Sequence, residues 1–256
     1  MYYTILMMKD IPPEVSELFK TLRRTIPAEF NPPEVAPVPG PLPGVCFFPG
    51  AAGVWGDADK REYVPFPSGG AMIVGQDWGT AQDYKEAGRE PWVEPCEATW
   101  DNLLSVLKDA GLPPEKCFFT NYFTGLRKTP PSTGEFPGAK DPRYAGLCGG
   151  FFLRQIAAAR PRLLVLLGLQ IPRRVALLSE ELKDWRDCGG IKSLDDAGAL
   201  KENARFGDHS VAAVCWLLHP SMRESNLRYR ARKNKTGAAI ERELMRDATR
   251  KSGILE

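Results

Sequence analysis

Three polar side chains of different chemistry each follow a short apolar run in the sequence: Asp77, Asn121 and His219. A carboxylate can stabilise a developing positive charge and orient water, and an imidazole can donate a hydrogen bond to a developing negative charge. A carboxamide offers one acceptor and two donors. Ligands of open parallel sheets bind beyond the carboxyl ends of the strands. If the apolar runs are parallel strands, we expect these three side chains to converge on one crevice.

From residue 71 onward, short apolar runs alternate with segments of helical periodicity. The strand candidates are 71–74, 117–119, 162–167 and 211–218, and the helix candidates are 99–110, 147–160, 172–180 and 237–251. Strands that alternate with helices are typical of βαβ units, in which helices cover both faces of a parallel sheet. We therefore predict a three-layer α/β/α sandwich with a central four-stranded parallel sheet, formed by a single domain over 71–256.

Residues 1–70 have a different composition. A helix is expected over 13–24, and seven prolines then fall between positions 27 and 43. Proline lacks a backbone N–H and is excluded from helix interiors and central strands. This segment is therefore expected to be an extended arm packed on the domain, or a linker. A second unfamiliar stretch, 181–208, is a charged insertion that either covers the crevice or lies on the surface.

The bulk composition is that of an ordinary globular protein, with 43% hydrophobic and 26% charged residues and a net charge of +2. No apolar run reaches the length of a bilayer-spanning helix, and residues 1–9 lack the features of a secretory signal. We expect a cytoplasmic monomer. The six cysteines form no C-x-x-C pair and there are only two histidines, so free thiols, no metal and no cofactor are expected.

Four segments, each at the end of a predicted strand or on the helix before one, resemble motifs of a known family. They are Gly75-Gln76-Asp77, the stretch 120–128 (TNYFTGLRK), the stretch 148–168 (CGGFFLRQIAAARPRLLVLLG) and His219-Pro220-Ser221. Together they resemble the uracil-DNA glycosylase superfamily, and the second and third are closest to its iron–sulfur branch. The resemblance covers residues 71–235 and has its four pieces in the expected order.

The resemblance implies an enzyme that flips uracil out of DNA and hydrolyses its N-glycosidic bond. Asp77 would stabilise positive charge on the sugar, and His219 would donate to the uracil O2 oxygen as the base leaves. Asn121 would read the N3–H and O4 edge of the base, and Gln76 would lie beside it. The residues alone leave other roles open. Asp77 is also suited to capping a helix over 80–87, Asn121 to ending a strand in a turn, and His219 to a structural position.

An aromatic side chain is expected to stack on the extruded base, and the resemblance does not identify it. Trp92 and Trp78 are the candidates, with Trp92 preferred, whereas Trp100 lies within a helical pattern and is expected in the core. The family's best-known branch has Pro-Tyr after the aspartate, and that tyrosine excludes the thymine methyl group. Here Trp78 and Gly79 follow Asp77, so either Trp78 takes over the exclusion or the pocket is less selective.

The segment after His219 is expected to contact DNA. Six basic residues stand between positions 223 and 235 against one acid, a pattern that suits either a polyanion-binding stripe or a solvated face. Phosphate contacts are expected from Ser221, Arg223, Arg228 and Arg230. Met222, or less favourably Leu227, is a candidate wedge for the space that the flipped base leaves, unless these side chains simply pack.

The sequence departs from the iron–sulfur branch in its cysteines. Only Cys148 matches a cluster ligand, and Leu126 stands near where another would be. A four-thiolate site would have to recruit Cys46, Cys96 or Cys117 through the fold. We therefore predict no cluster.

Two functions outside a glycosylase compete with this interpretation. The same fold could recognise abasic or damaged DNA without turnover, as the altered residues after Asp77 suggest. Alternatively, the run 77–80 (DWGT) fits the Asp-x-Gly-Thr phosphate loop of sugar kinases and actin-like ATPases, although no second phosphate loop is found.

Overall fold

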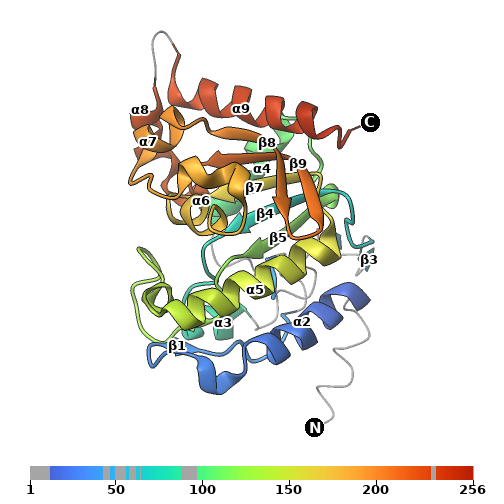
Figure 1. The fold of residues 1–256 in the computed structure, drawn as a ribbon, viewed down its shortest axis with the longest axis vertical. Coiled ribbons are helices and arrows are strands. Elements are labelled where there is room, and N and C mark those ends of the chain that lie inside the picture. The colour runs from blue at the N-terminus through green and yellow to red at the C-terminus, as the bar shows by residue number, and fades with distance from the viewer. Residues whose placement is uncertain are drawn as a thin grey trace.

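The computed structural model describes residues 12–42, 47–49, 56–57, 62–63, 65–87, 97–231 and 235–255. Its centre is a five-stranded sheet in the order β5-β4-β7-β9-β8 (Figure 1). The strands are β4 (Ala71–Gly75), β5 (Cys117–Asn121), β7 (Leu163–Leu167), β8 (Leu200–Phe206) and β9 (His209–Leu217). Strands β5, β4, β7 and β9 run parallel to one another, so their carboxyl ends lie at one edge of the sheet.

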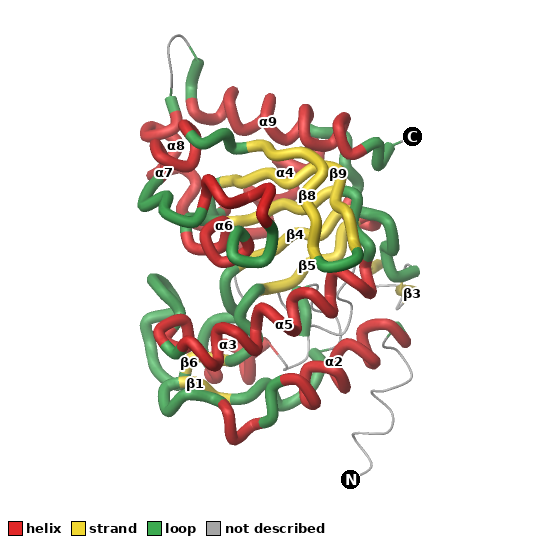
Figure 2. The backbone as a smooth tube through the Cα atoms, in the orientation of Figure 1, coloured by secondary structure: helices red, strands yellow, loops and turns green. Residues whose placement is uncertain are grey.

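Helices cover both faces of the sheet, as the predicted three-layer sandwich requires (Figure 2). They are α2 (Pro13–Thr25), α3 (Ala81–Ala87), α4 (Glu97–Asp109), α5 (Pro142–Ala159), α6 (Gln170–Val175), α7 (Ile191–Asp196), α8 (Arg223–Arg230) and α9 (Gly237–Ser252). Side chains that alternate along each strand separate into two clusters. Met72 and Val74 face the α5 side, whereas Ile73 faces α4 and α9. None of the described helices is both long and apolar enough to cross a membrane.

The sheet has one strand more than the four we predicted. The additional strand, β8, lies at the edge and is antiparallel to β9, within the stretch 181–208 that we interpreted as an insertion. Its sequence is LKENARF, and its charged residues suit the solvent-facing side of an edge strand. Because these residues interrupt the apolar run, the strand is not recognisable from the sequence pattern. The turn between β8 and β9 holds only Gly207 and Asp208, and this Gly-Asp pair is the signal from which the hairpin could have been predicted.

The described part of the N-terminal arm packs on the sandwich. Helix α2 lies beside α5 on the outer side of that layer (Figure 1), and its Val15 and Leu18 belong to the main buried cluster. After the 3-10 turn η2 (Ala28–Phe30), strand β1 (Val35–Ala36) pairs antiparallel with β6 (Leu126–Arg127). The arm therefore holds the segment that follows β5, which contributes to the site below.

The remaining described elements are short. They are strands β2 (Gly56–Asp57) and β3 (Glu62–Tyr63), and the 3-10 turns η3 (Pro114–Lys116), η4 (Pro137–Lys140), η5 (Glu180–Trp185) and η6 (Pro220–Met222). Helix α6 ends at Val175, five residues before the predicted end, and helix α5 begins at Pro142, five residues before the predicted start. The side chain of Asp141 accepts hydrogen bonds from the first turn of α5, an N-cap that fixes this start.

Candidate active site

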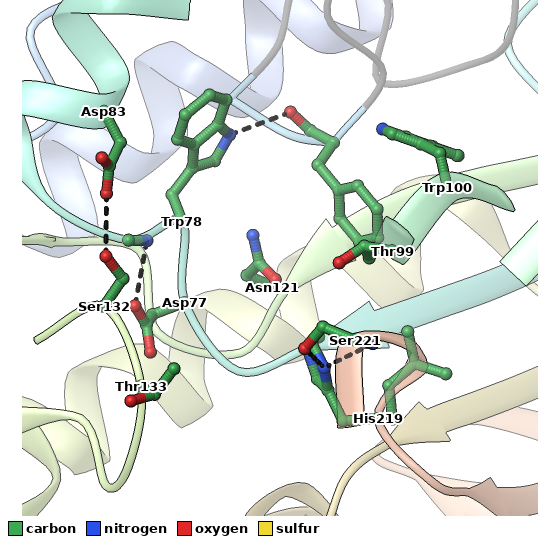
Figure 3. Close-up of a pocket in the computed structure, with 14 residues that line it drawn as sticks. Asp77, Trp78, Asp83, Thr99, Trp100, Asn121, Ser132, Thr133, His219 and Ser221 are labelled. Atoms are coloured by element: carbon green, nitrogen blue, oxygen red, sulfur yellow. Dashed lines mark hydrogen bonds between the residues drawn. The ribbon is translucent and has the colours of Figure 1, made fainter. Parts of the chain in front are cut away.

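A pocket of about 330 Å³ opens at the carboxyl edge of the sheet (Figure 3). Asp77, Asn121 and His219 all line it, although they are far apart in the sequence. Asp77 follows β4, Asn121 is the last residue of the neighbouring parallel strand β5, and His219 follows β9. The predicted convergence of a carboxylate, a carboxamide and an imidazole on one crevice therefore describes the geometry of this edge.

The carboxylate of Asp77 is fully engaged by neighbouring donors. Oδ1 accepts from the Gly79 N–H at 3.0 Å and from Arg127 Nε at 3.0 Å. Oδ2 accepts from Arg127 Nη2 at 2.9 Å and from Gln76 Nε2 at 2.9 Å. A carboxylate has about four acceptor positions, so these four hydrogen bonds fill them. The side chains of Asp77 and Arg127 are only 4% and 3% exposed, which makes the pair a buried, bidentate ion pair.

Arg127 also fixes the loop that forms one wall of the pocket. Nη2 donates to the Gly134 carbonyl at 2.9 Å, and Nη1 lies 3.2 Å from the Thr133 carbonyl, with two further loop carbonyls at 3.3 Å. Ser132 and Thr133 of this loop line the pocket. These two residues could not be identified from the sequence, because a loop carries no periodic pattern and its position depends on a distant arginine.

Asp77 does not cap helix α3. Thr80 and Asp83 form that cap, since the Thr80 N–H donates to Asp83 Oδ2 at 2.9 Å and the Asp83 N–H donates to Thr80 Oγ1 at 3.0 Å. Ser132 also donates to Asp83 Oδ2 at 3.1 Å. Burial acts to raise the pKa of Asp83, but hydrogen bonds from Thr80 and Ser132 outweigh it and hold the pKa below its ordinary value. Asp83 is therefore a second, ionised carboxylate on the pocket wall.

The side-chain amide of Asn121 is free of hydrogen bonds to any of the described residues, although the residue is only 6% exposed. Gly75 is the reason the amide fits, because a Cβ added at that glycine would lie 2.4 Å from Asn121 Oδ1. A buried amide without a protein partner is costly unless water or a ligand supplies one. Asn121 therefore presents its donors and acceptor to the contents of the pocket.

His219 is held with a defined ring nitrogen toward its own turn. Its Nδ1 lies 2.8 Å from Ser221 Oγ and accepts from the Ser221 N–H at 3.3 Å. Burial lowers the pKa of His219 from its ordinary value, and the nearby charge of Asp77 opposes this only in part. The ring is therefore neutral at physiological pH, and because Nδ1 acts as an acceptor, the proton resides on Nε2. Such a ring can donate one hydrogen bond through Nε2.

The turn that carries His219 is positioned from behind by a buried acid. The Leu218 N–H donates to Glu241 Oε1 of helix α9 at 2.8 Å. Glu241 is 1% exposed and also pairs with Arg230 at 3.0 Å and with Arg223 at 2.7 Å. The helix that follows the turn is thereby fixed to the same carboxylate as the turn itself.

The aromatic side chain that we could not assign from the sequence has a different candidate in the structure. Phe47 lines the pocket, with its ring 5.3 Å from Trp100 and 5.6 Å from Phe119 between centroids. Trp78 forms another part of the wall, and its indole N–H points to the Phe47 carbonyl at 3.4 Å. Trp100 is buried as predicted, although it also lines the pocket. Trp92 lies outside the described residues.

Phe47 was missed because it stands in a segment with no regular pattern, 44–70. Its signal was the adjacent pair Phe47-Phe48 in a stretch rich in glycine and proline. The Phe48 N–H donates to the Phe119 carbonyl of β5 at 2.9 Å, which fixes this aromatic pair beside the sheet.

The comparison with known families agrees with this geometry. The family model described as the uracil DNA glycosylase superfamily matches residues 63–242, which is more than half of the chain. The chain belongs to the uracil DNA glycosylase superfamily. A search of curated proteins found no match to the chain. The matched range contains Asp77, Asn121 and His219, and membership supports a DNA glycosylase role and DNA as the substrate in general terms.

The predicted DNA-contacting residues of this superfamily member divide into two groups. Ser221 and Arg228 are exposed, and Met222 is 49% exposed, which is unusual for a large apolar side chain. Arg228 lies over the ring of Tyr229 and donates to its hydroxyl. Leu227 is partly buried against the core. These positions leave Met222 as the more accessible of the two candidate wedges.

The prediction that Arg230 contacts phosphate is wrong for this structure. Its side chain is 0% exposed, pairs with Asp195 and Glu241, and lies 4.2 Å from the Trp216 ring centroid. Arg223 is 15% exposed and is paired with Glu241. The basic stripe is therefore partly structural, because a helix places successive arginines on opposite sides and sequence alone does not show which side is buried. Arg232 and Lys233 lie outside the described residues.

The surroundings of Cys148 do not suit a metal ligand. The thiol is fully buried beside Thr124 Oγ1 at 4.0 Å, and burial raises the pKa of the thiol to about 11, which keeps it protonated. In the described part of the chain, no three His, Cys, Asp or Glu side chains are grouped as a metal site would need. Cys46 and Cys96 are not among the described residues, so the absence of a cluster stays a prediction.

Proposed function

We propose that this protein is a hydrolytic DNA glycosylase that removes a deaminated base, with uracil as the preferred substrate, and leaves an abasic site. The observation that supports this most is the grouping of Asp77, Asn121 and His219 around one pocket of about 330 Å³. We further propose that it acts as a monomer in the cytoplasm. A loop that binds phosphate, the kinase-like alternative, is disfavoured because Asp77 and Thr80 are already bonded to Arg127 and Asp83.

In the proposed reaction, the bond between N1 of the base and C1′ of the sugar breaks, and its electron pair leaves with the base. Asn121 has both donors and an acceptor for the N3–H and O4 edge. The Nε2–H of His219 donates to O2, where negative charge accumulates. A water molecule then adds to C1′, and one of its protons is released as the sugar hydroxyl forms. Phe47, which lines the pocket, is our candidate to stack on the base.

The role of Asp77 follows from its hydrogen bonds. With four donors around it, the carboxylate has no free position from which to take a proton from water. We therefore assign Asp77 the role of a fixed negative charge that stabilises positive charge on the sugar. Removing one preorganised oxyanion-hole donor typically lowers the rate by about 10²–10³-fold, and we expect a loss of similar size when this charge is removed.

The same observation also favours the second candidate function, recognition of abasic or damaged DNA without turnover. A carboxylate whose acceptor positions are filled by Arg127, Gly79 and Gln76 is a poor activator of water, so binding without hydrolysis is consistent with this geometry. The two functions make opposite predictions for cleavage but similar ones for DNA affinity.

The deciding experiment is a panel of single- and double-stranded oligonucleotides that carry uracil, hypoxanthine, xanthine or a mismatched thymine. Each is incubated with the protein and treated with alkali, which breaks the strand at an abasic site. We expect cleavage at uracil, and a loss of about 10²-fold or more in His219→Asn and Asn121→Ala. His209→Asn provides the matched control, because this second histidine does not line the pocket.

If the strands stay intact for every lesion and the protein binds an abasic duplex in a salt-dependent manner, the glycosylase function is refuted and DNA binding without turnover is supported. Equal losses in His209→Asn and His219→Asn would show that the pocket histidine has no special role.

A further inference from the structure

The turn that carries His219 is held at a second point, beyond His219 in the chain. The side chain of Asn102 in helix α4 donates through Nδ2 to the Pro220 carbonyl at 3.0 Å. The same carbonyl accepts the Arg223 N–H, so both of its lone pairs are used. Asn102 does not line the pocket, so it acts on the backbone of the turn rather than on what the pocket contains.

Two side chains from different helices therefore enclose His219. Glu241 of α9 accepts from the Leu218 N–H at 2.8 Å, directly before His219, and Asn102 of α4 donates directly after it. Both helices pack on the same face of the sheet, which makes them firm supports. A single anchor would leave the turn free to pivot about that point, whereas anchors on both sides of His219 fix its orientation.

The imidazole is in turn fixed relative to this turn. Its Nδ1 lies 2.8 Å from Ser221 Oγ (Figure 3). In addition, a Cβ added at Gly168 would lie 3.4 Å from His219 Cβ, so the residue after β7 packs against the stem of the ring. The direction in which Nε2–H points thus depends on the two backbone anchors.

The bond to Pro220 accounts for an asparagine within helix α4. Asparagine forms helices less well than alanine, because its side chain competes for nearby backbone groups. Here the amide of Asn102 bonds instead to a carbonyl 118 positions away in the sequence. An aspartate at this position would have nearly the same shape but no donor for that carbonyl.

We propose that Asn102 is a positioning residue, which together with Glu241 holds the turn so that Nε2–H of His219 stays directed at the O2 oxygen of the base. The inference rests on the proposed function, because it takes His219 as the donor to the leaving base. Such a donor must be held within about 0.5 Å of its productive position, and a shift of about 1 Å can lower the rate roughly 10²-fold. Loss of the Asn102 anchor should therefore act on turnover more than on binding.

The kinetic test uses Asn102→Asp, which keeps the shape and removes the donor, and Asn102→Ala, which removes the donor without adding a charge. On a uracil-containing strand we expect both to lower kcat by about 10- to 100-fold, with KM and the Kd for an abasic strand unchanged. Asp101→Asn is the matched control, because Asp101 is the exposed neighbour on the same helix and receives the reverse exchange of carboxylate and amide. It should retain the kcat of the unaltered protein.

A spectroscopic test of the same bond does not depend on turnover. The chain has only two histidines, so the imidazole nitrogen NMR signals of His219 can be compared with those of His209 in one spectrum. In both Asn102 variants the His219 signals should shift or broaden, while the His209 signals stay unchanged. A loss of overall stability alone would not change the ring signals of protein that is still folded.

The proposal is overturned if the His219 signals respond to neither variant, or if the losses in kcat are no larger than in Asp101→Asn. A larger effect on KM than on kcat would also overturn it, because it would show a role in binding rather than in orienting the donor. An unaltered protein that cleaves no base refutes the glycosylase, and the His219 signals then still decide whether Asn102 orients the ring.

Discussion

Breaking the buried ion pair between Asp77 and Arg127 should lower the free energy of unfolding by more than breaking a typical surface ion pair does. The effects of the two single substitutions on this free energy should not be additive. Both side chains are almost completely buried, at 4% and 3% exposed, and they are joined by two hydrogen bonds. Replacing either partner leaves an uncompensated charge in the interior. Truncating one member of a buried pair typically destabilises by about 3–5 kcal/mol. For a chain of this size, this corresponds to a decrease in Tm of roughly 6–20 °C.

The cycle consists of Asp77→Asn, Arg127→Gln and the double variant, measured by urea unfolding. The double variant removes both charges and keeps groups that can hydrogen-bond, so it should be more stable than the sum of the single losses implies. Coupling energies of contacting residues are commonly about 0.5–3 kcal/mol. Asp247 and Arg250 form a control pair, because their side chains are 45% and 76% exposed and the corresponding changes should cost less than about 1 kcal/mol.

The cycle also separates folding from chemistry at Asp77. If Asp77→Asn abolishes cleavage and the double variant restores stability without activity, the charge itself is required for the reaction. Additive effects, or single losses as small as those of the control pair, would refute the argument that the pair is buried and mutually dependent.

Two further predictions concern the turn after β9 and the helix α8 that follows it. Burial lowers the pKa of His219, so below about pH 6.5 the unfolded chain takes up a proton before the folded one does, and the free energy of unfolding should fall as the pH falls. Urea unfolding at pH 7.5 and pH 5 should show a smaller decrease in this free energy for His219→Asn than for the unaltered protein. Equal decreases in the two proteins would contradict the assignment. Arg230→Met should lower the free energy of unfolding by about 3–5 kcal/mol. Arg228→Ala should change that free energy by less than about 0.5 kcal/mol and reduce the slope of the salt dependence of DNA binding by about one. A stable Arg230→Met protein with weakened DNA binding would reverse the two roles.

The sheet and its edge were predictable because they depend on local patterns. Each parallel strand is a continuous apolar run, and each polar turn follows directly, so the positions of Asp77, Asn121 and His219 could be inferred without any contact information. The edge strand β8 escaped because charged residues are compatible with both an exposed strand and a surface loop. Only its short Gly207-Asp208 turn distinguishes the two.

The partners of the site residues were not predictable from these patterns. Arg127 is 50 positions from Asp77, and nothing in its local sequence shows that its guanidinium turns inward to hold the carboxylate. Phe47 reaches the pocket from the arm side through a backbone bond to β5. Arg230 could not be distinguished from Arg228, since two arginines two positions apart on a helix differ in exposure only when the packing of the helix is known.

The division between engaged and free polar groups gives the strongest argument about what the pocket binds. The charged groups on its wall, Asp77 and Asp83, already have donors, whereas the neutral amide of Asn121 has none among the described residues. His219 adds one neutral donor, and none of the described lysine or arginine residues lines the pocket. A phosphate or a carboxylate would find no counter-charge here, but a neutral, planar ring with alternating donors and acceptors would satisfy the free groups. In the function that we propose, base recognition in the pocket is separate from the phosphate contacts that we expect from the exposed residues Ser221 and Arg228, and extrusion of a base from DNA requires such a separation.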